Sequence, residues 1–587
     1  MLKLFKYLKP YIWLIIPLVI LTYLQVMANL SLPDLMAKIV DDGIIGQDMD
    51  AIIKNGITML LVTLGGGIAA IGVGYFAART ATGFARDIRQ KVFKKVESFS
   101  ISEFNKFSTA SLITRSTNDI QQVQSTTLMI LRLVLMAPLM AIGGLQKAME
   151  NAPGLSWIIA VAVISLLIVI IILFAAALPK FKLLQKMVDK LNLVTRENLT
   201  GLRVVRAFNK EKTEEKKFDN ANKDLMNLNL TVNRMIIIMQ PFMSLVMNVS
   251  LIAIVWFGAH LVSESSIEIG NMMAFMQYAT QVIMSFLMIS MLFIMIPRAS
   301  VSAKRVNEVI DTDVSIKDPK NPKKPAKNGH GKIEFRDVTF TYPDADTPVL
   351  SGINFTAEPG QTTAIIGSTG SGKSTLIGLI PRFYDVTAGQ ILIDDIDVRD
   401  LKLHDLYSQI GYVPQKGVLF SGTIKSNVAY GNEKASDKEI NQSIKIAQAS
   451  DFVNKKDDGV ESAISQGGAN VSGGQKQRLS IARALAVDPK VYIFDDSFSA
   501  LDFKTESKLK KALEKETRGK TSLIVAQRIS TIMNADKIIV MNEGKIVGKG
   551  THQELLKNNS VYQEIASSQL SEEELNNSAA DVKEEKL

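Results

Sequence analysis

The chain has 587 residues, 47% of them hydrophobic, and a mean hydropathy of +0.15. One hydrophobic core does not normally grow to this length, so several domains are expected. The chain has no cysteine, which excludes disulfides, thiolate zinc sites and cysteine nucleophiles. The net charge of +9 suits a nucleic acid or a membrane surface, and the position of the cations beside apolar runs favours the membrane.

The first part of the chain, residues 1–310, predicts a helical membrane domain. It holds six apolar stretches, each near or above the roughly 20 residues that cross a bilayer as a helix. They are Ile12–Leu32, Gly56–Ala78, Thr126–Leu145, Leu155–Leu178, Met235–Leu261 and Met272–Ile296. The basic N-terminus precedes the first stretch without a small-residue cleavage site, so we expect an anchor and not a signal peptide.

The connections between these stretches alternate in charge. The loop Asp41–Asp50 is acidic, whereas Arg86–Phe107 and Phe181–Leu230 are long and basic and keep helix-like apolar spacing. We therefore expect a multi-pass protein of the cell membrane, in which the positive-inside rule places both termini and both long connections on the cytoplasmic side. We expect the helices to continue beyond the bilayer as stalks. Short turns near Thr114–Gln121 and Ala207–Lys217 would meet a cytoplasmic partner.

Polar and soft side chains within the stretches allow two interpretations each. Arg132 is costly inside a bilayer and would mark a functional site, but we favour a position near the headgroups. Methionine recurs at helical spacing in the last two stretches: Met235, Met239, Met243, Met247, Met284, Met288, Met291 and Met295. Such side chains suit an adaptable cavity for varied apolar ligands, although ordinary helix packing is the favoured explanation.

The second part of the chain predicts a linker, residues 311–331, and an α/β domain, residues 332–566. Within this domain a stretch fits G-x-x-x-x-G-K-[ST], the P-loop, between a strand-like and a helix-like segment. Its glycines let backbone N–H groups approach phosphates, Lys373 supplies a charge, and Ser374 is placed to ligate Mg²⁺. The predicted ATP-binding residues are Gly367, Ser368, Thr369, Gly370, Ser371, Gly372, Lys373, Ser374 and Thr375.

Further segments of the same domain carry polar residues beside predicted strands or helices. Asp495 ends the apolar strand Val491–Phe494 and is expected to hold Mg²⁺. A Ser/Gly-rich helix start without a lysine is typical of an anion-binding element, and comprises Ser472, Gly473, Gly474 and Gln475. Gln415 follows a strand-like segment, and Tyr342 lies upstream of the P-loop.

The order of these motifs, followed by Ser499–Asp502, resembles the ATPase of ABC transporters. In that family they are the A-loop, Walker A, Q-loop, signature, Walker B and D-loop, and the signature is the discriminating one. Six spans before this ATPase resemble a bacterial multidrug-type ABC exporter half-transporter. The resemblance implies ATP bound at Tyr342 and Gln415 as well as the P-loop, and Mg²⁺ at Ser374, Gln415 and Asp495. It also implies two paired halves, with each ATP between the Walker motifs of one half and the signature of the other.

Two positions depart from the family pattern. Asp496 stands where the family normally has the glutamate that orients the attacking water, and Gln527 stands where it has the switch histidine. Aspartate is one methylene shorter, and glutamine cannot relay a proton. Since the signature Val471–Gln475 is undamaged, the chain resembles the degenerate-site subunit of heterodimeric ABC exporters. Its own site would bind ATP and hydrolyse it slowly, while Ser472–Gln475 would serve a partner half that keeps the glutamate and the histidine.

The expected function is thus ATP-driven export of hydrophobic or amphipathic compounds as half of a heterodimer. A lipid or peptide exporter is an alternative of the same class, and a membrane-anchored ATP-binding regulator is one of another class. A nucleic-acid-handling ATPase is disfavoured by the six spans, and no nucleic-acid partner is expected. Residues 567–587 are acidic and polar and predict a disordered tail.

Overall fold

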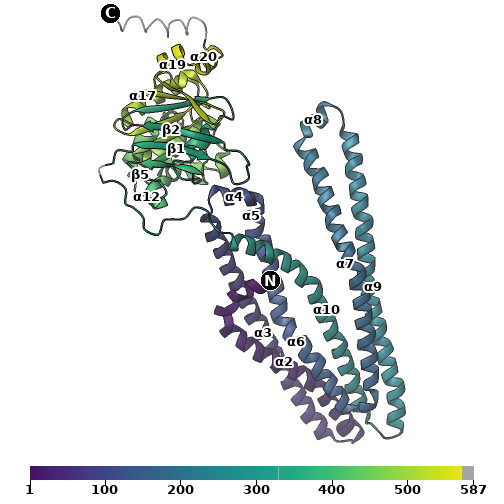
Figure 1. Cartoon of the computed structure of the whole chain (residues 1–587). Coiled ribbons are helices and arrows are strands. Elements are labelled where there is room, and N and C mark those ends of the chain that lie inside the picture. The colour runs from purple at the N-terminus through teal and green to yellow at the C-terminus, as the bar shows by residue number, and fades with distance from the viewer. Residues whose placement is uncertain (328, 571–587) are drawn as a thin grey trace, which may run out of the picture. The chain divides into compact units, whose positions relative to one another are not determined.

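The computed structural model describes residues 1–327 and 329–570 and divides into two compact units (Figure 1). Unit 1 comprises Met1–Glu97 and Thr109–Thr312, and unit 2 comprises Ser98–Ser108 and the chain from Asp313 onward. A short stretch from the first part of the sequence thus belongs to the α/β unit. Residues 571–587 of the expected tail lie outside the described residues, whereas residues 567–570 are described.

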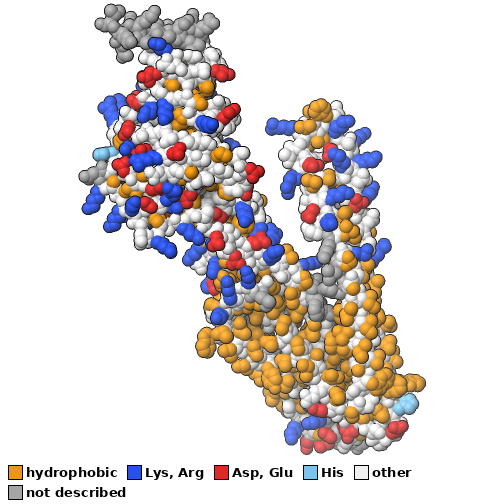
Figure 2. Space-filling model, viewed as in Figure 1, with side chains coloured by type: hydrophobic (Ala, Val, Ile, Leu, Met, Phe, Trp, Pro, Cys, Tyr) orange, Lys and Arg blue, Asp and Glu red, His pale blue; other side chains and the backbone are white. Residues whose placement is uncertain are grey.

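Unit 1 is helical, and six of its helices are long and apolar enough to cross a membrane. The expected spans fall in these six, which confirms the predicted fold class of this unit. Its α-helices are α1 (Leu2–Phe5), α2 (Ile12–Lys38), α3 (Met49–Glu97), α5 (Thr109–Ser116), α6 (Asn118–Asn151), α7 (Ser156–Thr200), α8 (Leu202–Ala207), α9 (Glu211–Ser263) and α10 (Ile269–Asp311). On the face shown in Figure 2, apolar side chains cover a broad band of the long helices, and charged side chains lie beyond it at both ends.

Small residues let three of the spanning helices approach closely. A Cβ on Gly143 of α6 would lie 2.4 Å from Leu30 of α2, and one on Gly144 would lie 2.9 Å from Val282 of α10. Beside this contact the Tyr278 hydroxyl donates to the Leu30 carbonyl at 2.7 Å and to Asp34 Oδ1 at 2.6 Å. Close helix approach and buried hydrogen bonds therefore replace the hydrophobic effect, which does not drive association inside a bilayer.

Both expected stalk turns are present, but one stalk helix ends earlier than expected. The segment Arg86–Phe107 is not one helix, because α3 ends at Glu97 and Ser100 caps a new helix, α4 (Ile101–Phe107). The expected turn at Thr114–Gln121 is reduced to Thr117, a single residue between α5 and α6. The expected turn at Ala207–Lys217 is present at 208–210, where Asn209 has a left-handed φ of 50°.

The methionines and Arg132 of the spans have different surroundings. Met243 is buried with Ala162, Leu166 and Ile283, and Met239 packs against this cluster, as in ordinary helix packing. Arg132 is exposed on α6. The Met291 side chain lies outside the described residues.

Unit 2 is built around a mixed sheet of six strands in the order β12-β11-β3-β10-β9-β6. Neighbours within β11, β3, β10, β9 and β6 are parallel, and β12 is antiparallel at one edge. A second, antiparallel sheet has the order β2-β1-β4-β5. The strands are β1 (Ile333–Phe340), β2 (Leu350–Ala357), β3 (Thr362–Gly367), β4 (Ala388–Ile393), β5 (Ile396–Asp397), β6 (Ile410–Val413), β7 (Gly422–Thr423), β8 (Ala463–Ile464), β9 (Val491–Asp495), β10 (Thr521–Val525), β11 (Lys537–Asn542) and β12 (Lys545–Gly550).

Helices cover these sheets, as the alternating pattern predicts for an α/β domain. Besides α4 they are α11 (Lys373–Gly378), α12 (Leu403–Tyr407), α13 (Ile424–Val428), α14 (Asp437–Ile446), α15 (Ser450–Val453), α16 (Gly473–Ala486), α17 (Phe503–Glu516), α18 (Ile529–Ile532), α19 (His552–Asn558) and α20 (Ser560–Ser567). The central parallel strands are buried on both faces, and β9 has no exposed residue. The functional side chains therefore appear where these strands end.

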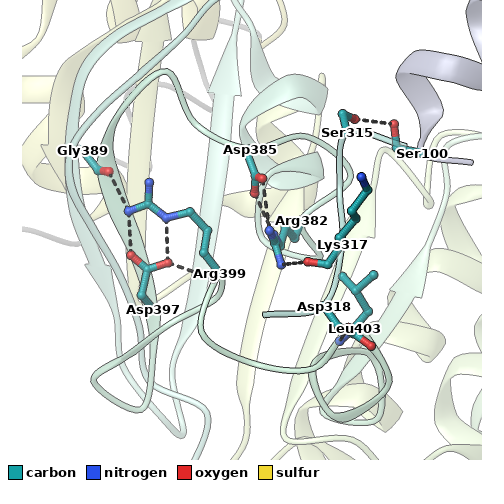
Figure 3. Close-up of polar contacts among 10 residues, drawn as sticks. All are labelled: Ser100, Ser315, Lys317, Asp318, Arg382, Asp385, Gly389, Asp397, Arg399 and Leu403. Carbon is teal, nitrogen blue, oxygen red and sulfur yellow. Dashed lines mark hydrogen bonds and ion pairs between the residues drawn. The ribbon is translucent and has the colours of Figure 1, made fainter. Parts of the chain in front are cut away.

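Residues 315–318 of the expected linker make hydrogen bonds to other segments of unit 2. Ser315 Oγ is 3.1 Å from Ser100 Oγ, beside α4, and the Lys317 carbonyl accepts from Arg382 at 3.3 Å (Figure 3). Asp318 Oδ1 then accepts from the Leu403 backbone at 2.8 Å, at the start of α12. A composition rich in Lys, Pro and Asp thus takes an ordered path here, because surface groups of the α/β unit satisfy its backbone.

Candidate nucleotide site

The P-loop connects the buried strand β3 to α11, the strand–loop–helix arrangement that the motif needs. Gly370 and Gly372 have left-handed φ angles of 85° and 95°, which glycine adopts without strain. Gly367 is required for a different reason, since a Cβ there would lie 2.2 Å from the Met541 carbonyl of β11. The loop can therefore fold back on the sheet and present backbone N–H groups at a helix start.

Lys373 and Ser374, the first residues of α11, face the carboxyl end of β9. Lys373 Nζ donates to the carbonyls of Gly367 and Ser368, both at 2.8 Å, and Ser374 Oγ donates to Asp495 Oδ1 at 3.0 Å. Burial lowers the pKa of Lys373, although Asp496 and Asp495 act in the opposite direction. Burial likewise raises the pKa of the Asp495 carboxyl, against the hydrogen bond from Ser374. A cation at Asp495 would oppose this effect of burial.

These side chains fit Mg²⁺. The Ser374 hydroxyl and the Asp495 carboxylate are the hard oxygen donors that this ion prefers. Gln415 Nε2 donates to Asp496, which leaves the amide oxygen of Gln415 free of that contact. Ser374, Asp495 and Gln415 would hold the ion, which would neutralise the phosphate charge.

Asp496 directly follows β9 and is 8% exposed. Its φ of 44° is left-handed, and its N–H donates to the Val525 carbonyl of β10 at 3.0 Å. Gln527, just beyond β10, donates through Nε2 to Asp496 Oδ2 at 2.8 Å, and Gln415 donates to the same oxygen at 3.1 Å. Two amides from different strand ends thus converge on one carboxylate oxygen.

Tyr342 follows β1 and contacts the far end of the P-loop. Its hydroxyl is 2.9 Å from Thr375 Oγ1, and its ring packs edge-on against Phe340 and Tyr384 at centroid distances of 4.9 and 5.3 Å. Tyr342 was predicted to bind the nucleotide, but the sequence carries no signal for this aromatic cluster. The cluster fixes the ring beside the phosphate loop.

A cavity of about 270 Å³ lies between these elements. It brings together most of the predicted residues and adds Val349 and Val525; its lining is Val349, Thr369, Gly370, Gly372, Lys373, Ser374, Thr375, Gln415, Asp495, Asp496, Val525 and Gln527. Tyr342 and three residues of the P-loop, Gly367, Ser368 and Ser371, do not line this cavity. Val349 directly precedes β2 and Val525 ends β10, and no motif marks either of these apolar residues.

The predicted signature residues lie elsewhere and do not line this cavity. Ser472 caps α16: its hydroxyl accepts from the Gln475 N–H at 3.3 Å, and its own N–H donates to Gln475 Oε1 at 3.0 Å. Ser472 and Gly473 are exposed. A Cβ on Gly474 would lie 3.1 Å from the Ala500 carbonyl, so this glycine allows the helix start to approach the segment Ser499–Asp502.

Both units match families of known proteins. Residues 14–286 match the family model of the ABC transporter transmembrane region, and residues 350–499 match that of the ABC transporter. An uncharacterised ABC transporter ATP-binding protein of Mycobacterium tuberculosis is 42% identical over 96% of this chain and 97% of its own length. An ATP-dependent lipid A-core flippase of Syntrophus aciditrophicus is 35% identical, covering 83% and 81%. A probable multidrug resistance ABC transporter protein of Bacillus subtilis is 35% identical, covering 81% of each chain.

The fold is shared with a bacterial Atm1-family ABC exporter solved with ATP bound. The TM-score is 0.80 at 24% identity, over 96% of this chain and 99% of that one. Six membrane helices and a P-loop ATPase in one chain define a membrane transport ATPase. The chain belongs to the ABC transporter family, as an exporter half with one transmembrane and one ATPase domain. It is a multi-pass membrane protein with a cytoplasmic ATPase domain, it uses ATP and Mg²⁺, and such halves act as dimers.

Proposed function

We propose that this chain is the degenerate-site half of a heterodimeric exporter of hydrophobic or amphipathic compounds in the cell membrane. Its own Walker site binds ATP and hydrolyses it slowly. Its signature completes the faster site of a homologous half that keeps the catalytic glutamate and the switch histidine. ATP binding would close the two ATPase domains and switch the membrane domain from inward to outward access.

The arrangement around Asp496 carries this proposal. Asp496 Oδ2 accepts from both Gln415 and Gln527, at 3.1 and 2.8 Å, which uses both lone pairs of that oxygen. A general base must reach a water at hydrogen-bond distance, and this carboxylate is one methylene short of the usual glutamate. Gln527 can hydrogen-bond a phosphate but cannot relay a proton as histidine does. Three disadvantages for hydrolysis thus coincide, while Lys373, Ser374 and Asp495 keep a geometry suited to binding.

The signature supports the second half of the proposal. Ser472 and Gly473 are exposed at the start of α16, and the capping box of Ser472 and Gln475 is complete. The exposed start of the 14-residue helix α16 suits an anion presented by another molecule, because the first N–H groups of a helix have no partner within it. Drift that removed function from the whole domain would not be expected to keep this element.

Two relatives support the proposed substrate class. The multidrug relative supports small apolar compounds, and the lipid A-core flippase, which is equally similar at 35%, supports a lipid as the second candidate. A panel of drugs, lipids and peptides, tested for stimulation of the ATPase rate in nanodiscs, separates these candidates. Stimulation by lipids alone would replace drug export with lipid export.

The degenerate-site proposal is tested by the ATPase rate of the purified heterodimer. Asp496→Asn should reduce turnover by less than about twofold. Ser472→Ala combined with Gly474→Asp should reduce it by about 10²–10³-fold, because it removes groups that contact ATP at the competent site. Ser436→Ala is the matched control for Ser472, since Ser436 makes the same capping box with Glu439 at α14. It loses a helix cap without touching a signature.

The opposite order of effects would contradict the proposal. If Asp496→Asn abolished turnover as completely as the signature change, Asp496 would be the working carboxylate. The chain would then be described as a homodimeric exporter that uses aspartate. Equal losses from Ser436→Ala and the signature change would instead indicate that helix stability, and not ATP contact, explains the signature effect.

A further inference from the structure

Residues 526–529, which include Gln527 and are called the switch segment below, contact the C-terminal end of the described chain. Gln527 is exposed, but Ala526 and Ile529 on either side of it are 3% and 0% exposed and belong to one apolar cluster. Tyr562 and Ala566 of α20 complete this cluster, and Leu570 packs against it. The last described residues thus lie directly behind the switch.

The side-chain amide of Gln569, just after α20, connects this end of the chain to the switch segment. Its Oε1 accepts from the Ile529 N–H at 2.9 Å, and its Nε2 donates to the Gln527 carbonyl at 2.9 Å. The first N–H groups of a helix have no intrahelical partner, so Gln569 satisfies one at the start of α18. The donor and the acceptor of the amide match their two backbone partners, and the reversed amide would match neither.

Gln569 is itself held in place. Its N–H and that of Leu570 donate to the Ala566 carbonyl at 3.0 and 2.9 Å, and Ala566 is fully buried. Tyr562, one turn earlier, is also fully buried, and its hydroxyl is 2.7 Å from His552 Nδ1 on α19. A movement of the Gln527 backbone must therefore break the bonds to Gln569 or carry the end of α20 with it.

The Gln527 side chain lines the nucleotide cavity together with Lys373 and Ser374, the residues at the γ-phosphate and Mg²⁺ end. We propose that Gln569 is a positioning residue for nucleotide discrimination. It fixes the backbone of Gln527 so that the amide stays at the γ-phosphate position, and it does not touch the nucleotide itself. ADP lacks the γ-phosphate, so the support should favour ATP over ADP.

The test measures binding to the full-length chain in nanodiscs with Mg²⁺, by displacement of a fluorescent nucleotide with AMP-PNP or ADP. Gln569→Ala should weaken AMP-PNP binding about two- to tenfold, the range for one lost hydrogen bond, and leave ADP within twofold. Gln569→Glu keeps an acceptor for Ile529 but sets a carboxylate against the Gln527 carbonyl, so it should weaken AMP-PNP at least as much. Gln563→Ala is the control: Gln563 lies on α20, its side-chain amide donates to the Leu556 carbonyl, and its loss should change neither affinity.

A double-mutant cycle distinguishes positioning from general support. In a Gln527→Ala background, Gln569→Ala should have no further effect on the ratio of ADP to AMP-PNP affinity. Additive effects, equal losses for both nucleotides, or no loss in either Gln569 variant would overturn the inference. Because binding and not turnover is measured, the result stands apart from the proposal of slow hydrolysis.

Discussion

Single atoms decide how the P-loop can fold against the sheet. Gly370 and Gly372 need glycine for their backbone angles, whereas Gly367 needs it because the Met541 carbonyl occupies the place of a side chain. Glycines that look equivalent in the motif are thus required for different physical reasons. A single atom is also decisive at Asp496, where Oδ2 accepts hydrogen bonds from two side-chain amides that follow separate strands.

Gly367→Ala should destabilise the ATPase domain and weaken ATP binding. The added Cβ would lie 2.2 Å from the Met541 carbonyl, and a shift of β3 or β11 costs typically about 1–3 kcal/mol. The measurement is thermal unfolding of the full-length protein with and without Mg·ATP. Gly378→Ala, at the end of α11, is the control, since its Cβ would lie 3.8 Å from the Phe383 side chain, an ordinary van der Waals contact. A Gly367→Ala protein as stable as this control would contradict the steric argument.

Among the elements, α4 and the segment after α10 are joined by one carboxylate. Glu103 is 7% exposed and accepts from Ser100 N at 2.8 Å, Ser100 Oγ at 2.6 Å and Ser315 N at 3.1 Å. It caps its own helix and fixes the first residues of the linker at the same time. A capping residue on a short helix thus orders a distant part of the chain.

Glu103→Ala should loosen both segments together. Removing a charged acceptor costs about 1–3 kcal/mol, so amide exchange at 98–108 and 313–318 should rise about tenfold or more. Hydrogen exchange of the full-length protein measures this. Glu439→Ala removes a capping-box glutamate of α14, which contacts no linker, and should affect only that helix. Faster exchange at 98–108 alone would show that Glu103 does not hold the linker.

Acid should reproduce this effect in the wild type. Burial raises the pKa of Glu103, but the hydrogen bonds from Ser100 and Ser315 outweigh it and leave the pKa below the ordinary 4.5. Because the folded pKa is the lower one, the stabilisation is present above pH 4.5 and is lost as the pH falls through the folded value. Exchange in the two segments should therefore rise in that range.

For the whole molecule, the charge asymmetry of the connections sets the orientation. Asp48 is exposed in the acidic loop after α2, and Lys94 is exposed near the basic end of α3. These two positions lie at opposite ends of one 49-residue helix, roughly 70 Å apart at 1.5 Å per residue. A helix of that length crosses the bilayer and continues well beyond it.

Asp48→Cys should react with a membrane-impermeant maleimide in intact cells, and Lys94→Cys should react only after lysis. The chain has no cysteine of its own, so the unlabelled wild type sets the background. The physical reason is that cationic connections remain on the cytoplasmic side. The reverse labelling pattern would mean that the positive-inside rule fails for this chain.

The sequence by itself determined the two-part fold, the six spans and the place of the nucleotide site. Apolar runs near 20 residues and the strand–P-loop–helix pattern are local signals, and local signals survive without knowledge of the rest of the chain. Thr369, Lys373, Ser374, Gln415, Asp495 and Gln527 were predicted and line one cavity, because the carboxyl ends of parallel strands meet at one edge of the sheet.

Tertiary structure alone decided the remainder. The end of α3 was not predicted, since a capping box at Ser100 starts a new helix within a segment of helical pattern. Val349 and Val525 in the cavity, and Gln569 behind the switch, carry no motif. Gln569 lies 42 residues after Gln527 in the sequence, so only the packing of α20 with β11 and α18 in one apolar cluster brings the two together. Contacts of that separation depend on the whole fold, which no local pattern encodes.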